Sequence, residues 1–138
     1  MVDLLDWPTD SRDNYVMTDA ANTVVNAYAV GGLRALALLS NASGDGEAAA
    51  AFATSAQSIE RAVNTLLWDP ASGLYRDGLD DAGEPIDHTA WHASVFAAAF
   101  GLVPAARWPR LLTYFRQRGM VGSVYSAFYF LQACAYPI

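Results

Sequence analysis

Five predicted helical segments of two kinds alternate along this chain, and their order constrains the fold more than any other feature. Segments 22–39, 89–100 and 123–136 are apolar around nearly the whole helix. Segments 45–67 and 104–118, which lie between them, carry one apolar stripe and one polar face. A helix that is apolar all round is buried on all sides. The chain is therefore expected to alternate buried helices with surface helices.

Two helical architectures have this alternation: a toroid with an inner and an outer ring of helices, and an α-solenoid of stacked hairpins. A solenoid shows an internal repeat of about 34 to 47 residues, and no such repeat is found. We therefore expect an all-α fold, a partial (α/α)6 toroid with about five helices in alternating inner and outer hairpins. Residues 1–138 are expected to form a single segment of that domain.

The apolar content of the chain exceeds what a domain of this size ordinarily buries. Hydrophobic residues make up 54% of the chain and charged residues 16%, whereas charged residues make up about a quarter of an average soluble domain. This excess predicts self-association through exposed inner helices, or a place within a larger protein.

Charge and hydropathy argue against two classes of partner. The net charge is −6, and an acidic chain does not attract phosphate backbones, so no nucleic-acid partner is expected. No apolar run reaches the roughly 18 residues that span a bilayer, so no membrane association is expected. The opening "MVDLLDWP" lacks the basic and apolar regions of a signal peptide. A cytoplasmic location is therefore expected, and the single cysteine, Cys134, cannot form an internal disulfide.

The connections that enter the three apolar helices carry most of the chemistry-bearing residues. In a toroid the inner helices run in one direction, so segments 6–19, 68–88 and 116–123 would open on the same face. Aromatic rings stack on sugars, and carboxylates, His and Arg hydrogen-bond their hydroxyls. The predicted substrate-binding residues are Trp7, Arg12, Asp13, Tyr15, His88, Trp91 and His92. A structural role in the core or in loop organisation stays open for each.

No metal ion or other cofactor is expected. His88 and His92 lie four residues apart on one helix face, but no third ligand is visible and zinc needs at least three protein ligands. The acidic stretch "DGLDDAGEPID" lacks the ligand spacing of an EF-hand. The stretch "DPASGLYRDG" predicts a turn between two short extended pieces, with Gly73 and Gly78 as turn residues.

Five stretches, in order, resemble the catalytic domain of bacterial α-L-rhamnosidases. They are "DWP…RDNY", "NTVVNAY…LRALALL", "LLWDPASGLYRDG", "HASVFAAAFGLVP" and "RGMVGSVYSAFYFLQA". These enzymes are glycoside hydrolases built on an (α/α)6 barrel. The resemblance implies an inverting mechanism, in which one carboxylic acid protonates the leaving oxygen and a second carboxylate activates water. It also implies that a complete barrel would take a rhamnosylated carbohydrate or glycoside.

The same resemblance implies that the chain lacks the catalytic pair. The family's general acid lies upstream of "DWP", and its general base is a Glu downstream of the last helix. The Glu residues here are Glu47, Glu60 and Glu84, and none matches a catalytic position. The expectation is a barrel fragment, or a naturally short relative, that contributes part of a sugar pocket and is inactive alone. The alternatives are another toroid sugar enzyme (a lyase or epimerase), or a non-catalytic helical scaffold or sugar-binding remnant.

Overall fold

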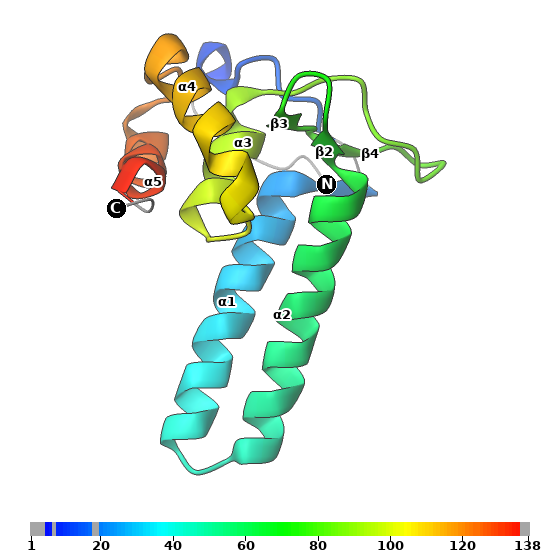
Figure 1. The fold of residues 1–138 in the computed structure, drawn as a ribbon, viewed down its shortest axis with the longest axis vertical. Helices are drawn as coiled ribbons and strands as arrows, with labels where there is room; N and C mark the ends of the chain where they lie inside the picture. The colour runs from blue at the N-terminus through cyan, green and yellow to red at the C-terminus, as the bar shows by residue number, and fades with distance from the viewer. Residues whose placement is uncertain (1–4, 7, 18–19, 136–138) are drawn as a thin grey trace.

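The computed structural model describes residues 5–6, 8–17 and 20–135, and this part of the chain is mostly helical (Figure 1). Its α-helices are α1 Thr23–Ala42, α2 Gly46–Leu66, α3 Trp91–Ala99, α4 Trp108–Arg118 and α5 Val124–Ala135. Two short 3-10 helices are η1 Thr9–Arg12 and η2 Ala105–Arg107. The five α-helices coincide with the five expected segments to within about four residues at each end. The fold is consistent with a partial helical toroid.

Helices α1 and α2 form a long hairpin that projects beyond the rest of the molecule (Figure 1). Asp45 caps α2 by accepting a hydrogen bond from the Ala48 N–H at 3.0 Å. The α1 helix has 20 residues and α3 only 9, so α1 is roughly 16 Å longer at 1.5 Å per residue. Arg34 Nη1 donates to the Phe100 carbonyl oxygen at 2.6 Å and thereby ties the end of α3 to the middle of α1.

Only one of the three apolar helices is buried on all sides. All nine residues of α3 are buried, because α1 packs on one side of it and α5 on another. Helices α1 and α5 keep apolar faces in solvent, so the expectation of full burial is wrong for both. Their large exposed side chains are Val25, Leu36, Leu38 and Leu39 on α1, and Val124, Tyr125, Phe128 and Leu131 on α5.

Two adjacent glycines in α1 have different surroundings. A Cβ on Gly31 would lie 2.4 Å from the Phe100 ring, so the missing side chain makes room for the end of α3. A Cβ on Gly32 would meet nothing within 4 Å. The close neighbour at Gly31 is thus an aromatic ring, and a side chain at Gly32 would have no close neighbour.

The segment between α2 and α3 contains short strands. Strands β2 Trp68–Asp69 and β3 Leu74–Tyr75 pair antiparallel, and Gly73 turns between them with φ +71°. Strand β4 Gly78–Leu79 pairs with β1 Ala21–Asn22. A Cβ on Gly78 would lie 2.0 Å from the Ala21 carbonyl oxygen. Gly73 is therefore a turn residue as expected, whereas Gly78 is a strand residue that another strand approaches closely.

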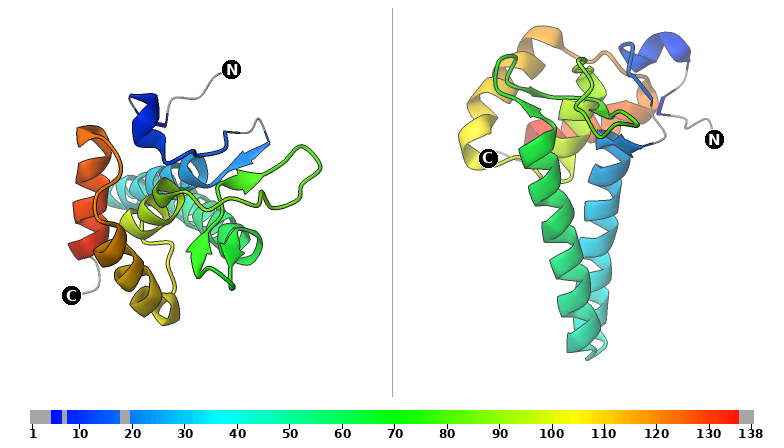
Figure 2. Two further views of the ribbon diagram at one scale, coloured as in Figure 1. Left: turned by 90° about the horizontal axis from the view of Figure 1, so that it is seen from above. Right: turned by 90° about the vertical axis from the view of Figure 1, so that its right-hand side faces the viewer.

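The view from above separates the helices by direction (Figure 2). It looks along α1 and α2 nearly end-on, whereas α4 and α5 are seen from the side. The second pair of helices is therefore steeply inclined to the first, and α3 lies between them. The connections that enter α1, α3 and α5 gather at the end of the molecule opposite the α1–α2 turn (Figures 1 and 2).

Helix α1 also passes a test for membrane spans. It is the one described helix that is long and apolar enough to cross a bilayer by length and composition. The expectation that no segment reaches this length is therefore wrong. The core helix of a soluble protein passes the same test, and α1 packs along both α2 and α3.

Candidate functional site

The entrance segment is fixed by the carboxylate of Asp6. Asp6 is 2% exposed and accepts hydrogen bonds from the Ser123 N–H at 3.0 Å and from both hydroxyls of Ser123 and Ser126. It also faces His92 Nε2 at 3.0 Å. Burial alone would raise the pKa of Asp6, but these hydrogen bonds together hold it well below its usual range. The segment before α1 is thus joined to α3 and α5.

A second carboxylate, that of Asp13, caps the start of α3. Asp13 lies in the left-handed region with φ 51°. Its Oδ2 accepts from the Trp91 N–H and its Oδ1 accepts from Arg118 Nη2, both at 2.7 Å. The residue before the helix, Ala90, offers no side-chain cap of its own. A carboxylate at a helix N-terminus is favoured by the unpaired N–H groups and the dipole.

The third carboxylate, Asp77, is completely buried and connects two parts of this region. Its Oδ1 accepts from the Ala90 N–H and its Oδ2 from the Val16 N–H, each at 2.7 Å. The Nδ1 of His88 also lies 2.7 Å from Oδ2. The Asp77 carbonyl oxygen accepts from the buried Tyr15 hydroxyl. Asp77 therefore holds the entrance segment and the α2–α3 connection against each other.

We call the surface formed by residues 5–17, 77–92 and 118–126 the mouth. Two of its predicted substrate-binding residues are wholly buried in the structure. Trp91 has no exposed surface, and its Nε1 donates to the Gly119 carbonyl oxygen at 2.9 Å. His92 has none either, and its Nδ1 has no hydrogen-bond partner within the described residues. Burial lowers the pKa of His92 although Asp6 favours its charged form.

Two other predicted residues present polar atoms to solvent. Arg12 donates through Nε to the Asp6 carbonyl oxygen at 2.9 Å, and its Nη atoms are unpaired in the described part of the chain. The side chain of His88 is 35% exposed. Trp7 lies outside the described residues. The structure thus brings Arg12, Asp13, Tyr15, His88, Trp91 and His92 into one region, and contact of any of the seven with a sugar stays a prediction.

A small pocket of about 170 Å³ lies between the first turns of α1 and α5. Its polar groups come from Asn22, Tyr28 and Tyr125, and aliphatic side chains and Met17 form the rest. The two phenol oxygens are 3.0 Å apart. Burial and the neighbouring Tyr125 raise the pKa of Tyr28. The sequence alone favours a core position for Tyr125 at the start of the last apolar helix, but Tyr125 is 57% exposed, so that expectation is wrong.

A larger cavity lies elsewhere, in the groove between α1 and α2. It has a volume of about 540 Å³ and an alanine-rich lining. Its charged groups are Arg34 and Glu60, which form an ion pair at 2.7 Å. These two charges satisfy each other, and Arg34 also binds the end of α3, so both charged groups of the groove are already paired with protein groups.

Sequence reasoning missed Asp77, Ser123 and Ser126. The partners of Asp77 lie up to 62 residues away along the chain, and a buried Asp before a Gly looks the same in sequence as a turn Asp. No group of three or more His, Cys, Asp or Glu suited to a metal occurs among the described residues.

Comparisons with known proteins agree with this architecture. A family model described as the mannosylglycerate hydrolase MGH1-like glycoside hydrolase domain matches residues 6–123. A solved structure, the GH78 family rhamnosidase of Bacillus sp. GL1, is similar in fold with a TM-score of 0.72 at 22% identity. The similarity covers 91% of this chain and 15% of that protein. No curated protein matches. The chain belongs to the family of MGH1-like glycoside hydrolase domains.

Proposed function

We propose that this chain forms one wall of the sugar pocket of a glycoside hydrolase barrel that removes terminal α-L-rhamnose. The observation that carries the proposal is the mouth, where three buried or capping carboxylates hold the entrances of α1, α3 and α5 together. A rigid rim of this kind supports accessible side chains for ligand binding. A glycoside hydrolase domain acts on carbohydrate, and the sequence resemblance favours rhamnose.

The predicted binding residues divide into two groups under this proposal. Arg12 and His88 contact sugar hydroxyls directly, because the Arg12 Nη atoms and His88 Nε2 have no hydrogen-bond partner among the described residues, and the His88 side chain is 35% exposed. Asp13, Tyr15, Trp91 and His92 hold the rim in place, because their polar atoms bind protein groups or their side chains are buried. Trp7 is assigned to stacking on the ring of the sugar.

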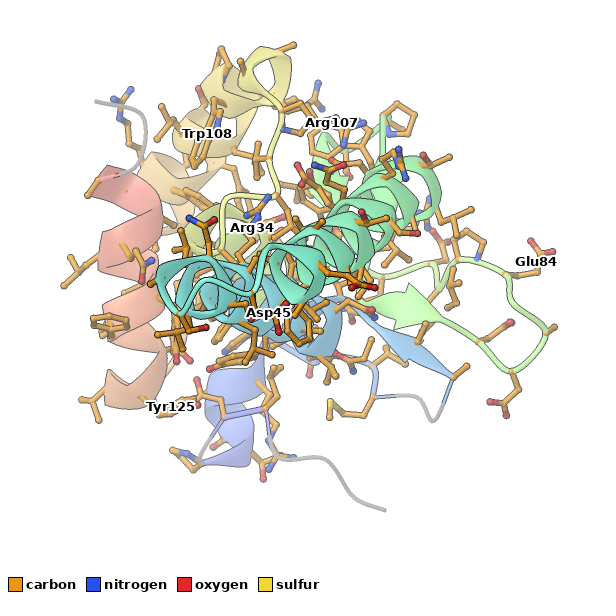
Figure 3. All side chains as sticks on the ribbon, turned by 90° about the horizontal axis from the view of Figure 1, so that it is seen from below. Arg34, Asp45, Glu84, Arg107, Trp108 and Tyr125 are labelled. Atoms are coloured by element: carbon orange, nitrogen blue, oxygen red, sulfur yellow. The ribbon has the colours of Figure 1, made fainter. Side chains whose placement is uncertain are left out.

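The proposal includes the absence of a catalytic acid and base. Inverting glycosidases need two carboxyl groups on opposite sides of the scissile bond. The mouth carboxylates Asp6, Asp13 and Asp77 all accept hydrogen bonds from protein donors. Glu60 pairs with Arg34, and Glu84 lies at the outer end of its loop, far from Tyr125 (Figure 3). Hydrolysis would then require carboxylates from further barrel segments, which would cover the exposed faces of α1 and α5.

A second substrate is favoured by one specific observation. The matched family takes its description from a mannosylglycerate hydrolase, and the glycerate part of such a substrate carries a carboxylate. The Nη atoms of Arg12, which have no hydrogen-bond partner in the described part of the chain, offer a planar, bidentate site for a carboxylate. Mannosylglycerate is therefore the alternative ligand for the same mouth.

Calorimetric titration with L-rhamnose and with mannosylglycerate tests the proposal. We expect saturable binding of one of the two sugars and a loss of affinity of about 10- to 150-fold in Arg12→Ala, since hydrogen bonds to charged groups are worth about 1.5–3 kcal/mol. Arg61→Ala is the matched control, because Arg61 is exposed on α2 away from the mouth. Binding that Arg12→Ala leaves unchanged would contradict the assignment.

A hydrolysis assay tests the missing acid and base. We expect no release of nitrophenol from a nitrophenyl α-L-rhamnoside by the purified chain. Turnover that survives purification and disappears in Asp13→Asn would show that this chain carries a catalytic carboxylate, and the proposal would be wrong on that point.

A further inference from the structure

His88 and Asp77 form a histidine–carboxylate pair at the edge of the mouth. The carboxylate is completely buried, whereas the imidazole is 35% exposed. Their contact joins His88 Nδ1 to Asp77 Oδ2 at 2.7 Å. A backbone hydrogen bond of 3.0 Å from the Asp77 N–H to the His88 carbonyl oxygen holds the two residues in register. The ring therefore has one nitrogen fixed inside the protein.

The remaining hydrogen bonds of Asp77 determine which nitrogen of His88 carries the proton. Both carboxylate oxygens already accept backbone N–H groups, from Ala90 and from Val16. An ionised carboxylate can only accept, so His88 Nδ1 is the donor. In the neutral ring Nε2 is then an unprotonated acceptor. Nε2 has no partner among the described residues and is not a buried atom, so it is open to solvent.

The charged neighbours of the pair are already matched with each other. Asp87, next to His88 in sequence, forms an ion pair with Arg76 at 2.9 Å, and Arg76 also lies 3.4 Å from Asp69. The Tyr15 hydroxyl donates to the Asp77 carbonyl oxygen rather than to its carboxylate. Asp77 is thus the charged group in direct contact with the imidazole in the described part of the chain.

We infer that Asp77 orients His88 so that Nε2 accepts a hydrogen bond from a hydroxyl of a sugar bound at the mouth. His88 is the ligand-contacting residue and Asp77 is the positioning residue. A buried carboxylate that accepts the Nδ1 proton fixes the tautomer and makes the other nitrogen a better acceptor. The ligand class rests on the proposed function, but the tautomer does not.

Nitrogen-15 NMR of the chain labelled at histidine tests this inference, because the chain has only two histidines. The structure assigns them opposite tautomers: Nδ1–H for His88, and Nε2–H for His92, which donates to Asp6. The spectrum is recorded at about pH 8, where ordinary histidines are neutral, and His88→Gln identifies the signals. An Nε2–H tautomer, or an averaged signal like that of free imidazole, at His88 would overturn the inference.

Asp77→Asn separates the positioning role from a purely structural one. The amide leaves one oxygen to serve three donors, so the His88 signal is expected to move towards a mixture of tautomers while the His92 signal stays unchanged. A folded Asp77→Asn chain with an unchanged His88 tautomer would contradict the role of Asp77. If Asp77→Asn does not fold, the tautomer of His88 in the unmodified chain still tests whether Nδ1 carries the proton.

Titration with L-rhamnose tests the ligand role. We expect the His88 Nε2 signal to shift, the His92 signal to stay fixed, and binding by His88→Gln to be about 3- to 10-fold weaker. Binding of L-rhamnose without a shift of the His88 Nε2 signal would overturn the contact between His88 and the sugar, and it would leave the proposed function intact. If no signal responds to L-rhamnose or to mannosylglycerate, the proposed function and the ligand role of His88 are both overturned. The tautomer of His88 would still test separately whether Asp77 orients the ring.

Discussion

Replacement of Asp6 by Ala tests whether the entrance segment is a fixed part of the fold. The carboxylate accepts from one backbone N–H, two serine hydroxyls and one imidazole, all within the buried region around Ser123, Ser126 and His92. A buried donor left without an acceptor costs about 1–3 kcal/mol. These single costs do not simply add, because the remaining groups partly rearrange. Removing one partner from a buried charged network costs about 3–5 kcal/mol in total. We expect the free energy of unfolding to fall by about 3–5 kcal/mol.

The measurement is urea unfolding followed by far-UV circular dichroism, with Asp10→Ala as the matched control. Asp10 is exposed in η1, and surface substitutions usually change stability by less than about 0.5 kcal/mol. If Asp6→Ala lowers the free energy of unfolding by less than about 1 kcal/mol, or by no more than Asp10→Ala does, the entrance segment is not anchored as described.

Three further predictions concern stability and association. Gly32→Ala is expected to raise the free energy of unfolding by up to about 1 kcal/mol. Gly31→Ala is expected to lower it, because the added Cβ would meet the Phe100 ring. Equal changes for the two variants in urea unfolding would contradict the packing of α3 on α1. Burial lowers the pKa of His92, so the folded chain binds a proton there less readily than the unfolded chain does. The free energy of unfolding should therefore fall as the pH drops below about 6.5. In unfolding curves recorded over a pH series, His92→Gln should lack this contribution to the loss of stability. Phe128→Lys on the exposed face of α5 should reduce self-association in sedimentation velocity, and an unchanged distribution would argue against that face as the contact.

Local signals in the sequence predicted the helices because the physics that sets them is local. Apolar spacing marked the helical segments, and Gly101 and Gly119, both at positive φ, follow the ends of α3 and α4. Burial is harder to predict in this way, because the sequence of a helix gives its hydropathy but does not show which neighbouring elements cover it. The exposed faces of α1 and α5 follow from this difference.

The candidate site could be located from sequence but not worked out in detail. The rule that inner helices enter from one face was enough to bring Arg12, Asp13 and His88 together. The hydrogen bonds that decide their roles span long separations, 78 residues from Asp13 to Trp91 and 117 from Asp6 to Ser123. No local pattern encodes such pairs, so a buried His and an accessible His looked alike in the sequence.

Chemical-shift mapping of L-rhamnose and mannosylglycerate binding on the nitrogen-15-labelled chain tests the central claim most directly. We expect one of these sugars to shift the signals of Arg12, His88 and their neighbours at the mouth in a saturable way. We expect the signals in the larger α1–α2 groove, for example those of Ala53 and Gln57, to stay unchanged. Shifts confined to that groove, or none with either sugar, would contradict the assignment of the mouth as the sugar-binding wall.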